Sequence, residues 1–158
     1  MGGLDGLRRA VGVDAPLIEQ LVIAAYSGYI DRIGMKPNPM LDDYSVLIAG
    51  DEVWVLGSDP LDAVLVLVDR GAFLLIDNVA VRPDQQGRGL GGLLVRFAER
   101  RALESGLAEV RLYTNELMTE NRARYAKWGY REVGRVSVNG RHGVLMNKTL
   151  GRDRGAGT

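Results

Sequence analysis

The spacing of apolar residues divides the first third of the chain into helical segments. From Ala15 to Tyr29, apolar side chains recur every three or four positions, which predicts an amphipathic helix with Asp14 placed to cap its start. A glycine and two prolines between residues 34 and 39 end that helix. A second short helix is expected over residues 41–48, before the break at Gly50.

The middle and end of the chain alternate between strand-like and helical patterns. Apolar, partly β-branched runs indicate strands, and the stripe of apolar residues that begins at Leu90 indicates a helix that Gly106 ends in a left-handed conformation. A short helix is expected over residues 119–127. The predicted strands cover residues 7–11, 52–56, 63–68, 72–81, 110–113, 130–138 and 144–150.

This order of elements predicts an α/β fold with a mixed, mostly antiparallel central sheet flanked by helices. The sequence contains no repeat and no linker that would divide it. We therefore expect one domain over residues 1–150, followed by a polar, glycine-rich tail over residues 151–158 that is disordered.

The composition excludes several classes of function. Lys plus Arg and Asp plus Glu number 20 each, so no basic field exists to attract nucleic acid. The chain has no cysteine and one histidine, His142, which argues against a metal centre, a disulfide and a Ser-His-Asp triad. Apolar runs are far shorter than the ~20 residues of a membrane span, so we expect a cytoplasmic protein without membrane contacts.

The clearest chemical signal is the glycine-rich stretch 86–92, which lies between a predicted strand and a predicted helix. Glycines let a backbone pass close to a bulky anion, and the start of a helix offers unpaired N–H groups and a positive dipole end. Arg88 adds a positive charge. Together these features predict a ligand that carries phosphate.

Three kinds of glycine loop compete for this stretch. A phosphate-binding P-loop requires a lysine after its last glycine, and none lies near. Gly87, Gly89 and Gly92 satisfy the dinucleotide pattern G-x-G-x-x-G, but that loop normally follows the first strand and has an acid at the end of the next one. Here Glu109 opens the next strand, so an NAD(P) site is the weaker alternative. A turn with only a packing role is the third alternative, and it is disfavoured because four glycines lose much conformational entropy on folding.

Two segments resemble the motifs of a known family. Residues 77–99 resemble the core motif of the GCN5-related N-acetyltransferases (the GNAT family), in which Gln or Arg, two residues, Gly, one residue, and Gly or Ala follow each other; Gln86, Gly89 and Gly91 fill these positions. Residues 121–132 resemble the second motif, in which a tyrosine on a short helix precedes glycine and an aromatic residue. The similarity extends over roughly residues 52–150.

The resemblance implies a fold whose sheet is splayed to admit acetyl-CoA, with the strand near residue 79 pairing with the pantetheine arm. An N–H group near Val79 would polarise the thioester carbonyl. The family has an asparagine at the position of Met118, so the cofactor contact expected of that asparagine falls on Asn115 or Asn121. The implied cofactor-binding residues are Val79, Ala80, Val81, Gln86, Gly87, Arg88, Gly89, Leu90, Gly91, Gly92, Asn115 and Asn121.

Two residues are implied in catalysis. Tyr125 would protonate the departing thiolate of coenzyme A, and Asp77, on the same strand face as Val79, would take the proton of the amine directly or through water. Asp77 could equally serve only to orient loops.

The sequence therefore predicts an N-acetyltransferase that moves the acetyl group of acetyl-CoA directly to an amine of a small molecule or peptide. The alternatives are an inactive coenzyme A-binding module and, further off, an NAD(P)-dependent oxidoreductase. The family resemblance also admits a homodimer.

Overall fold

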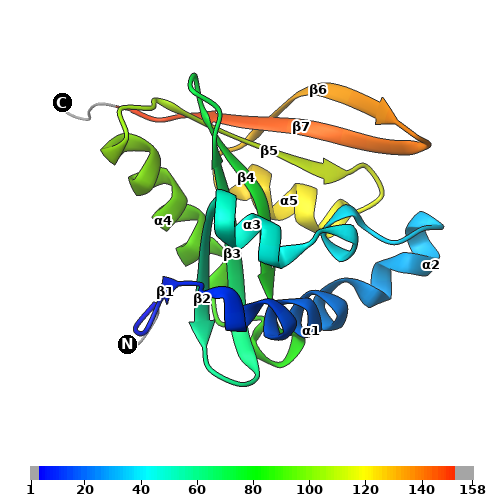
Figure 1. Ribbon diagram of the computed structural model, residues 1–158. Coiled ribbons are helices and arrows are strands. Elements are labelled where there is room, and N and C mark those ends of the chain that lie inside the picture. The colour runs from blue at the N-terminus through cyan, green and yellow to red at the C-terminus, as the bar shows by residue number, and fades with distance from the viewer. Residues whose placement is uncertain (1–3, 152–158) are drawn as a thin grey trace. The chain divides into compact units, whose positions relative to one another are not determined.

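Seven strands form one sheet in the order β1-β2-β3-β4-β5-β7-β6 (Figure 1). The computed structural model describes residues 4–151. Pairing is parallel between β4 and β5 and antiparallel in β1–β2, β2–β3, β5–β7 and β6–β7, which confirms the predicted mixed, mostly antiparallel sheet. The strands are β1 (Arg8–Arg9), β2 (Glu52–Gly57), β3 (Leu61–Asp69), β4 (Leu74–Val81), β5 (Glu109–Asn115), β6 (Arg131–Val138) and β7 (Arg141–Thr149).

The helices accompany the strands in the predicted order. The α-helices are α1 (Ala15–Tyr26), α2 (Ile30–Ile33), α3 (Tyr44–Gly50), α4 (Leu90–Glu104) and α5 (Thr119–Lys127). Short 3₁₀ turns are η1 (Gly12–Asp14), η2 (Ser27–Tyr29), η3 (Asn38–Leu41) and η4 (Pro83–Gln85). None of the helices described is both long and apolar enough to cross a membrane.

The chain divides into two compact units. Unit 1 comprises Met1–Val68 and Asp77–Val95, and unit 2 comprises Asp69–Ile76 and Arg96–Thr158. Strand β4 and helix α4 each contribute residues to both units. Of the predicted tail, only the exposed Gly151 is described, and residues 152–158 lie outside the described residues.

The core of unit 1 forms where one stripe of α1 meets the sheet. Ile18, Leu21 and Val22 lie on that stripe and are at most 3% exposed. Complete burial of such a side chain contributes about 1.5–3 kcal/mol, so this packing fixes α1 against the strands. The stripe packs with residues of α3, β2, β3 and β4, namely Tyr44, Val53, Val55, Leu61, Val64, Val66 and Ala80.

The cap of α1 and the start of α3 differ from the prediction, whereas α1 begins at Ala15 as predicted. Asp14 does not cap α1, because its own backbone is helical (φ −78°, ψ −16°) and its carboxylate accepts hydrogen bonds from Val11 N, at 2.8 Å, and from Arg8. Helix α3 begins at Tyr44, three residues later than expected, because Asp43 caps it by accepting from the N–H groups of Ser45 and Val46. A capping carboxylate thus sets the start of α3.

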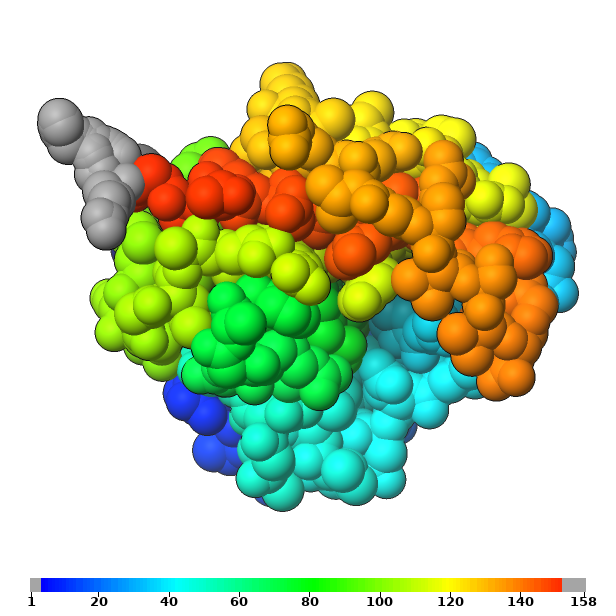
Figure 2. All heavy atoms as spheres, turned by 90° about the horizontal axis from the view of Figure 1, so that it is seen from above, coloured from blue at the N-terminus to red at the C-terminus, as the bar shows by residue number. Residues whose placement is uncertain are grey.

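In unit 2, β5, β7 and β6 lie side by side, and β6 is the outer strand (Figure 2). Strands β6 and β7 are joined by Asn139 and Gly140, both with positive φ (52° and 75°), as a tight two-residue hairpin turn requires. This turn lets β7 begin at Arg141, three residues before the predicted start. The carboxylate of Glu99 on α4 accepts from Tyr130 Oη at 2.8 Å and from Lys148 Nζ at 3.1 Å, which ties α4 to the end of this sheet.

Candidate active site

The glycine-rich stretch forms a loop that connects β4 to α4. Its backbone passes through η4 and then takes positive φ at Gly87 (84°) and Gly89 (79°), a conformation that other residues adopt only with strain. A Cβ atom at either position would meet nothing within 4 Å. Backbone conformation, and not crowding inside the protein, therefore requires these two glycines.

The first turn of α4 presents its N–H groups at the end of this loop. The helix's first hydrogen bond runs from Leu93 N to Gly89 O at 3.1 Å, so the N–H groups of Leu90, Gly91 and Gly92 have no partner within α4. These groups and the helix dipole favour an anion such as a phosphate group.

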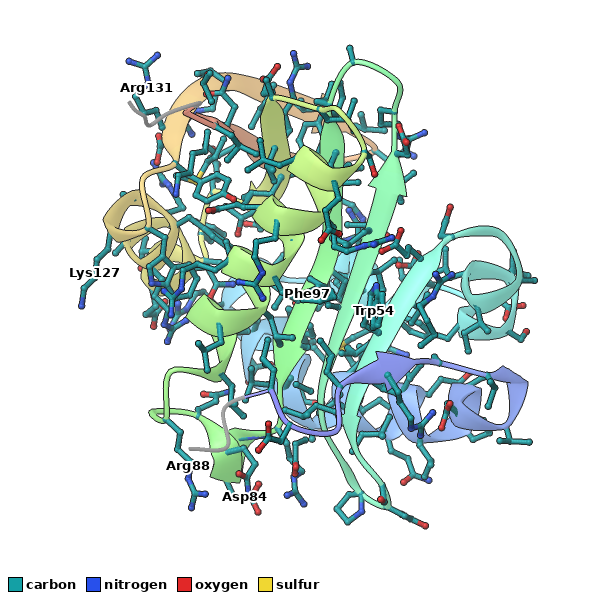
Figure 3. The ribbon with its side chains drawn as sticks, turned by 90° about the vertical axis from the view of Figure 1, so that its left-hand side faces the viewer. Trp54, Asp84, Arg88, Phe97, Lys127 and Arg131 are labelled. Atoms are coloured by element: carbon teal, nitrogen blue, oxygen red, sulfur yellow. The ribbon has the colours of Figure 1, made fainter. Side chains whose placement is uncertain are left out.

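Side chains at the loop connect it to β3 and β4. Gln86 Nε2 donates to Val81 O at 3.0 Å, and Arg82 pairs with Asp62 at 2.8 Å. Arg88 is exposed and makes no ion pair with residues 4–151. Figure 3 shows Arg88 and Asp84 extending from the loop away from the ribbon. Arg88 is therefore free to contact a bound anion.

The two faces of β4 have different surroundings. Asn78 and Ala80 are buried at 4% exposure each, whereas Asp77 is exposed and Val79 lies with it on the opposite face. Asn78 Oδ1 accepts from Tyr26 Oη at 2.8 Å. Its Nδ2 donates to Tyr44 Oη at 3.1 Å. These bonds fix the backbone of β4 next to Asp77.

Asp42 is a residue of unit 1 that the sequence analysis did not select. It lies in the segment between α2 and α3, it is half-buried, and burial together with the negative charge of Asp77 raises its pKa to about 6. The only signal in the sequence is weak: two aspartates, Asp42 and Asp43, are adjacent, and capping of α3 requires only Asp43. The nearness of Asp77 becomes visible only in the fold.

In unit 2, Tyr125 lies on α5 among aromatic rings. Its ring meets Trp128 and Tyr130 edge-on, with centroids 5.8 Å and 6.2 Å away. Burial raises its pKa to about 12, opposed by the charge of Arg124. Within residues 4–151 its hydroxyl has no hydrogen-bond partner. The side chain thus offers a protonated, unpaired phenol at neutral pH.

The two asparagines of unit 2 both bond locally. Asn115 Oδ1 accepts from Leu117 N at 2.9 Å, and Asn121 Oδ1 accepts from Arg124 at 2.8 Å. Met118, at the position where the family motif has asparagine, is 4% exposed and packs as an apolar residue. The structure does not favour either asparagine as the cofactor contact, and both assignments stay predictions.

Comparison with known proteins identifies the family. The family description "Acetyltransferase (GNAT) domain" matches residues 43–132, which is more than half of the chain and includes the glycine loop and Tyr125. The chain belongs to the GNAT acetyltransferase family. This confirms the resemblance found in the two sequence motifs. No curated protein is similar in sequence at the level that marks a relative.

Solved structures with the GNAT fold match nearly the whole chain. The PaiA N-acetyltransferase of Thermoplasma acidophilum in complex with coenzyme A is 14% identical, with a TM-score of 0.76 over 91% of this chain and 98% of that one. A GNAT acetyltransferase of Elizabethkingia anophelis with acetyl-CoA bound is 17% identical, with a TM-score of 0.64 over 91% and 97%. An IAA acetyltransferase of Bacillus cereus is 20% identical, with a TM-score of 0.68 over 91% and 98%. At these identities the likeness establishes the fold.

Proposed function

We propose that this GNAT protein transfers the acetyl group of acetyl-CoA to an amine of a small molecule or peptide. The observation that carries the proposal is the loop of unit 1, in which Gly87 and Gly89 with positive φ lead into three helix N–H groups next to Arg88, which makes no ion pair with the described residues 4–151. A pyrophosphate matches this set of donors. Fold relatives crystallised with coenzyme A or acetyl-CoA support the choice of ligand.

The proposed reaction is direct transfer. Backbone groups of residues 79–81 pair with the pantetheine arm, and an N–H group near Val79 polarises the thioester carbonyl. A carboxylate of unit 1 takes the proton of the amine, and Asp77 is the candidate from the sequence. Tyr125 gives its proton to the thiolate, a role that its raised pKa supports because the phenol stays protonated. The chain has no cysteine that could carry the acetyl group.

Release of the coenzyme A thiol in the presence of a panel of amines tests this function. The protein contains no cysteine, so any thiol detected comes from the donor. We expect release that depends on both acetyl-CoA and an amine, and on the order of 10²-fold or more lower kcat in Tyr125→Phe. Tyr130→Phe is the matched control, since its hydroxyl bonds Glu99 and its loss should lower stability but keep kcat.

Three outcomes separate the alternatives. Binding of acetyl-CoA without turnover on any amine would favour an inactive coenzyme A-binding module. Binding of NADH in place of acetyl-CoA would overturn the proposal and favour an oxidoreductase. Equal rates in Tyr125→Phe and the native chain would remove the phenol from the mechanism.

Cytoplasmic location and a homodimer belong to the same proposal. The outer strand β6 exposes Val133, Val136 and Val138 and gives the dimer a candidate surface. Sedimentation of the purified chain at several concentrations measures its mass and tests the dimer.

A further inference from the structure

The segment that precedes α3 is fastened to β4 through one buried tyrosine. Tyr44 is 1% exposed, its hydroxyl donates to Pro39 O at 2.6 Å, and it accepts from Asn78 Nδ2 at 3.1 Å. Asn78 directly follows Asp77 in β4, and Asp42 lies between Pro39 and Tyr44 in the chain. These two hydrogen bonds therefore hold Asp42 in the neighbourhood of Asp77.

The adjacent carboxylates Asp42 and Asp43 have different surroundings. Asp43 Oδ1 accepts from Ser45 N at 3.1 Å and from Ser45 Oγ at 2.6 Å, which lowers its pKa and keeps it charged. Within residues 4–151, Asp42 has neither a hydrogen-bond donor nor a cation as partner. Asp43 thus caps α3, whereas the Asp42 carboxylate can accept a proton from a bound substrate.

Acidic groups from three elements act together at this point. The charge of Asp77 on β4 raises the pKa of Asp42. The pKa of Tyr44 on α3 is raised by burial and also by the charges of Asp42, Asp77 and Glu19 on α1. Burial is the larger cause and the Asp77 charge the smaller one in raising the pKa of Asp42 to about 6. A carboxylate with this pKa is ionised at neutral pH but holds a proton more firmly than an ordinary aspartate, as a general base requires.

From this geometry we propose that Asp42 is the general base of the acetyl transfer and that Asp77 is the fixed negative charge beside it. The inference rests on the proposed function and identifies which of the two carboxylates takes the proton. It also identifies the acceptor class as a cationic primary amine, because two neighbouring carboxylates favour an ammonium group over a neutral one.

The proton balance of the step is complete. The ammonium R–NH₃⁺ gives one proton to the Asp42 carboxylate, and the freed amine forms a bond to the thioester carbonyl carbon. The carbon–sulfur bond then breaks, the nitrogen loses a second proton to the solvent, and the sulfur gains one from Tyr125, which recovers one from the solvent. The products are the amide, free coenzyme A and one proton that leaves Asp42 for water.

Titration of the carboxyl carbon signals by NMR tests the pair without any substrate. We expect the Asp42 carboxyl to titrate near pH 6 in the native chain and at a lower pH in Asp77→Asn, still above the ordinary aspartate range because burial, the larger cause, remains. Titration of Asp42 near the ordinary value in the native chain would overturn the inference and leave the proposed function intact.

The pH profile of kcat/KM tests the role in transfer. In the native chain we expect kcat/KM to fall tenfold per unit below about pH 6. Asp42→Asn should lose this acidic limb and on the order of 10²-fold in kcat/KM at pH 7.5, with unchanged affinity for acetyl-CoA. Asp43→Asn is the matched control, because asparagine also caps helices and should keep both the limb and the rate.

The two proposals fail in different ways. An active chain in which Asp42→Asn keeps the limb and the rate would contradict the role of Asp42 alone. A native chain that transfers no acetyl group to any amine would overturn the proposed function, and the role of Asp42 with it.

Discussion

At the level of single residues, the hydrogen-bond donors around each aspartate determine whether its carboxylate has a structural role. Asp14 is 3% exposed, and its oxygens accept from the two terminal nitrogens of Arg8 at 2.8 Å and 2.9 Å and from Val11 N at 2.8 Å. Hydrogen bonding from Arg8 is the largest cause of its lowered pKa, and burial opposes it. An aspartate is thus charged and structural at position 14, whereas at position 42 burial and the charge of Asp77 raise the pKa of the carboxyl.

Asp14→Ala is therefore expected to destabilise the fold by about 1–3 kcal/mol, because the hydrogen bonds that the buried carboxylate accepts from Arg8 and from Val11 N are lost. Asp14→Asn keeps an acceptor for that N–H and should lose less. The folded-state pKa of Asp14 is depressed, so its contribution is present above about pH 4 and is lost as the pH falls through the folded value. Urea unfolding of both variants at pH 7 and pH 3 measures this; a native–Ala difference that does not shrink at pH 3 would contradict it.

At the scale of elements, the junction of loop and α4 is the part that the proposed function uses. Gly89 and Gly106 lie before and after α4, both with φ of 79° and both with room for a Cβ. Alanine at either position should cost about 1–2 kcal/mol in backbone strain.

Only the change at Gly89 alters the N–H groups that face the proposed pyrophosphate. Gly89→Ala should weaken acetyl-CoA binding tenfold or more, while Gly106→Ala should lower the melting temperature similarly and keep the affinity. Fluorescence titration of both variants with acetyl-CoA makes the comparison. Equal affinity in the two would show that the loop does not hold the ligand.

Elements set by local sequence are predicted well, whereas contacts between distant residues are not. The bounds of α5, the order of elements along the chain and the glycine loop follow from local spacing and backbone preference, and the structure agrees with them. The cap at Asp14 was wrong, because capping depends on a backbone conformation that η1 changes. Asp42 was missed because its partner Asp77 lies 35 positions away (77 minus 42). The roles of Tyr125, Asn115 and Asn121 stay predictions.

At the scale of the whole molecule, two compact units share two elements. Strand β4 and helix α4 each supply residues to both units, so the chain continues from one unit into the other within a regular element. We therefore expect one domain over residues 1–150, as the sequence predicts.

Differential scanning calorimetry should accordingly show a single transition with equal calorimetric and van't Hoff enthalpies. Saturating acetyl-CoA at about 100 times its dissociation constant should add roughly 2.7 kcal/mol and raise the whole transition. Two separate transitions, of which acetyl-CoA moves one, would contradict a single cooperative domain.

Binding of acetyl-CoA by the loop at residues 86–92 is the basis of the proposed function. Isothermal titration calorimetry of the purified chain with acetyl-CoA tests it most directly, with NADH and ATP titrated under the same conditions. We expect saturable binding of one acetyl-CoA per chain, with no comparable heat from either nucleotide. Saturable binding of NADH, with none of acetyl-CoA, would contradict it.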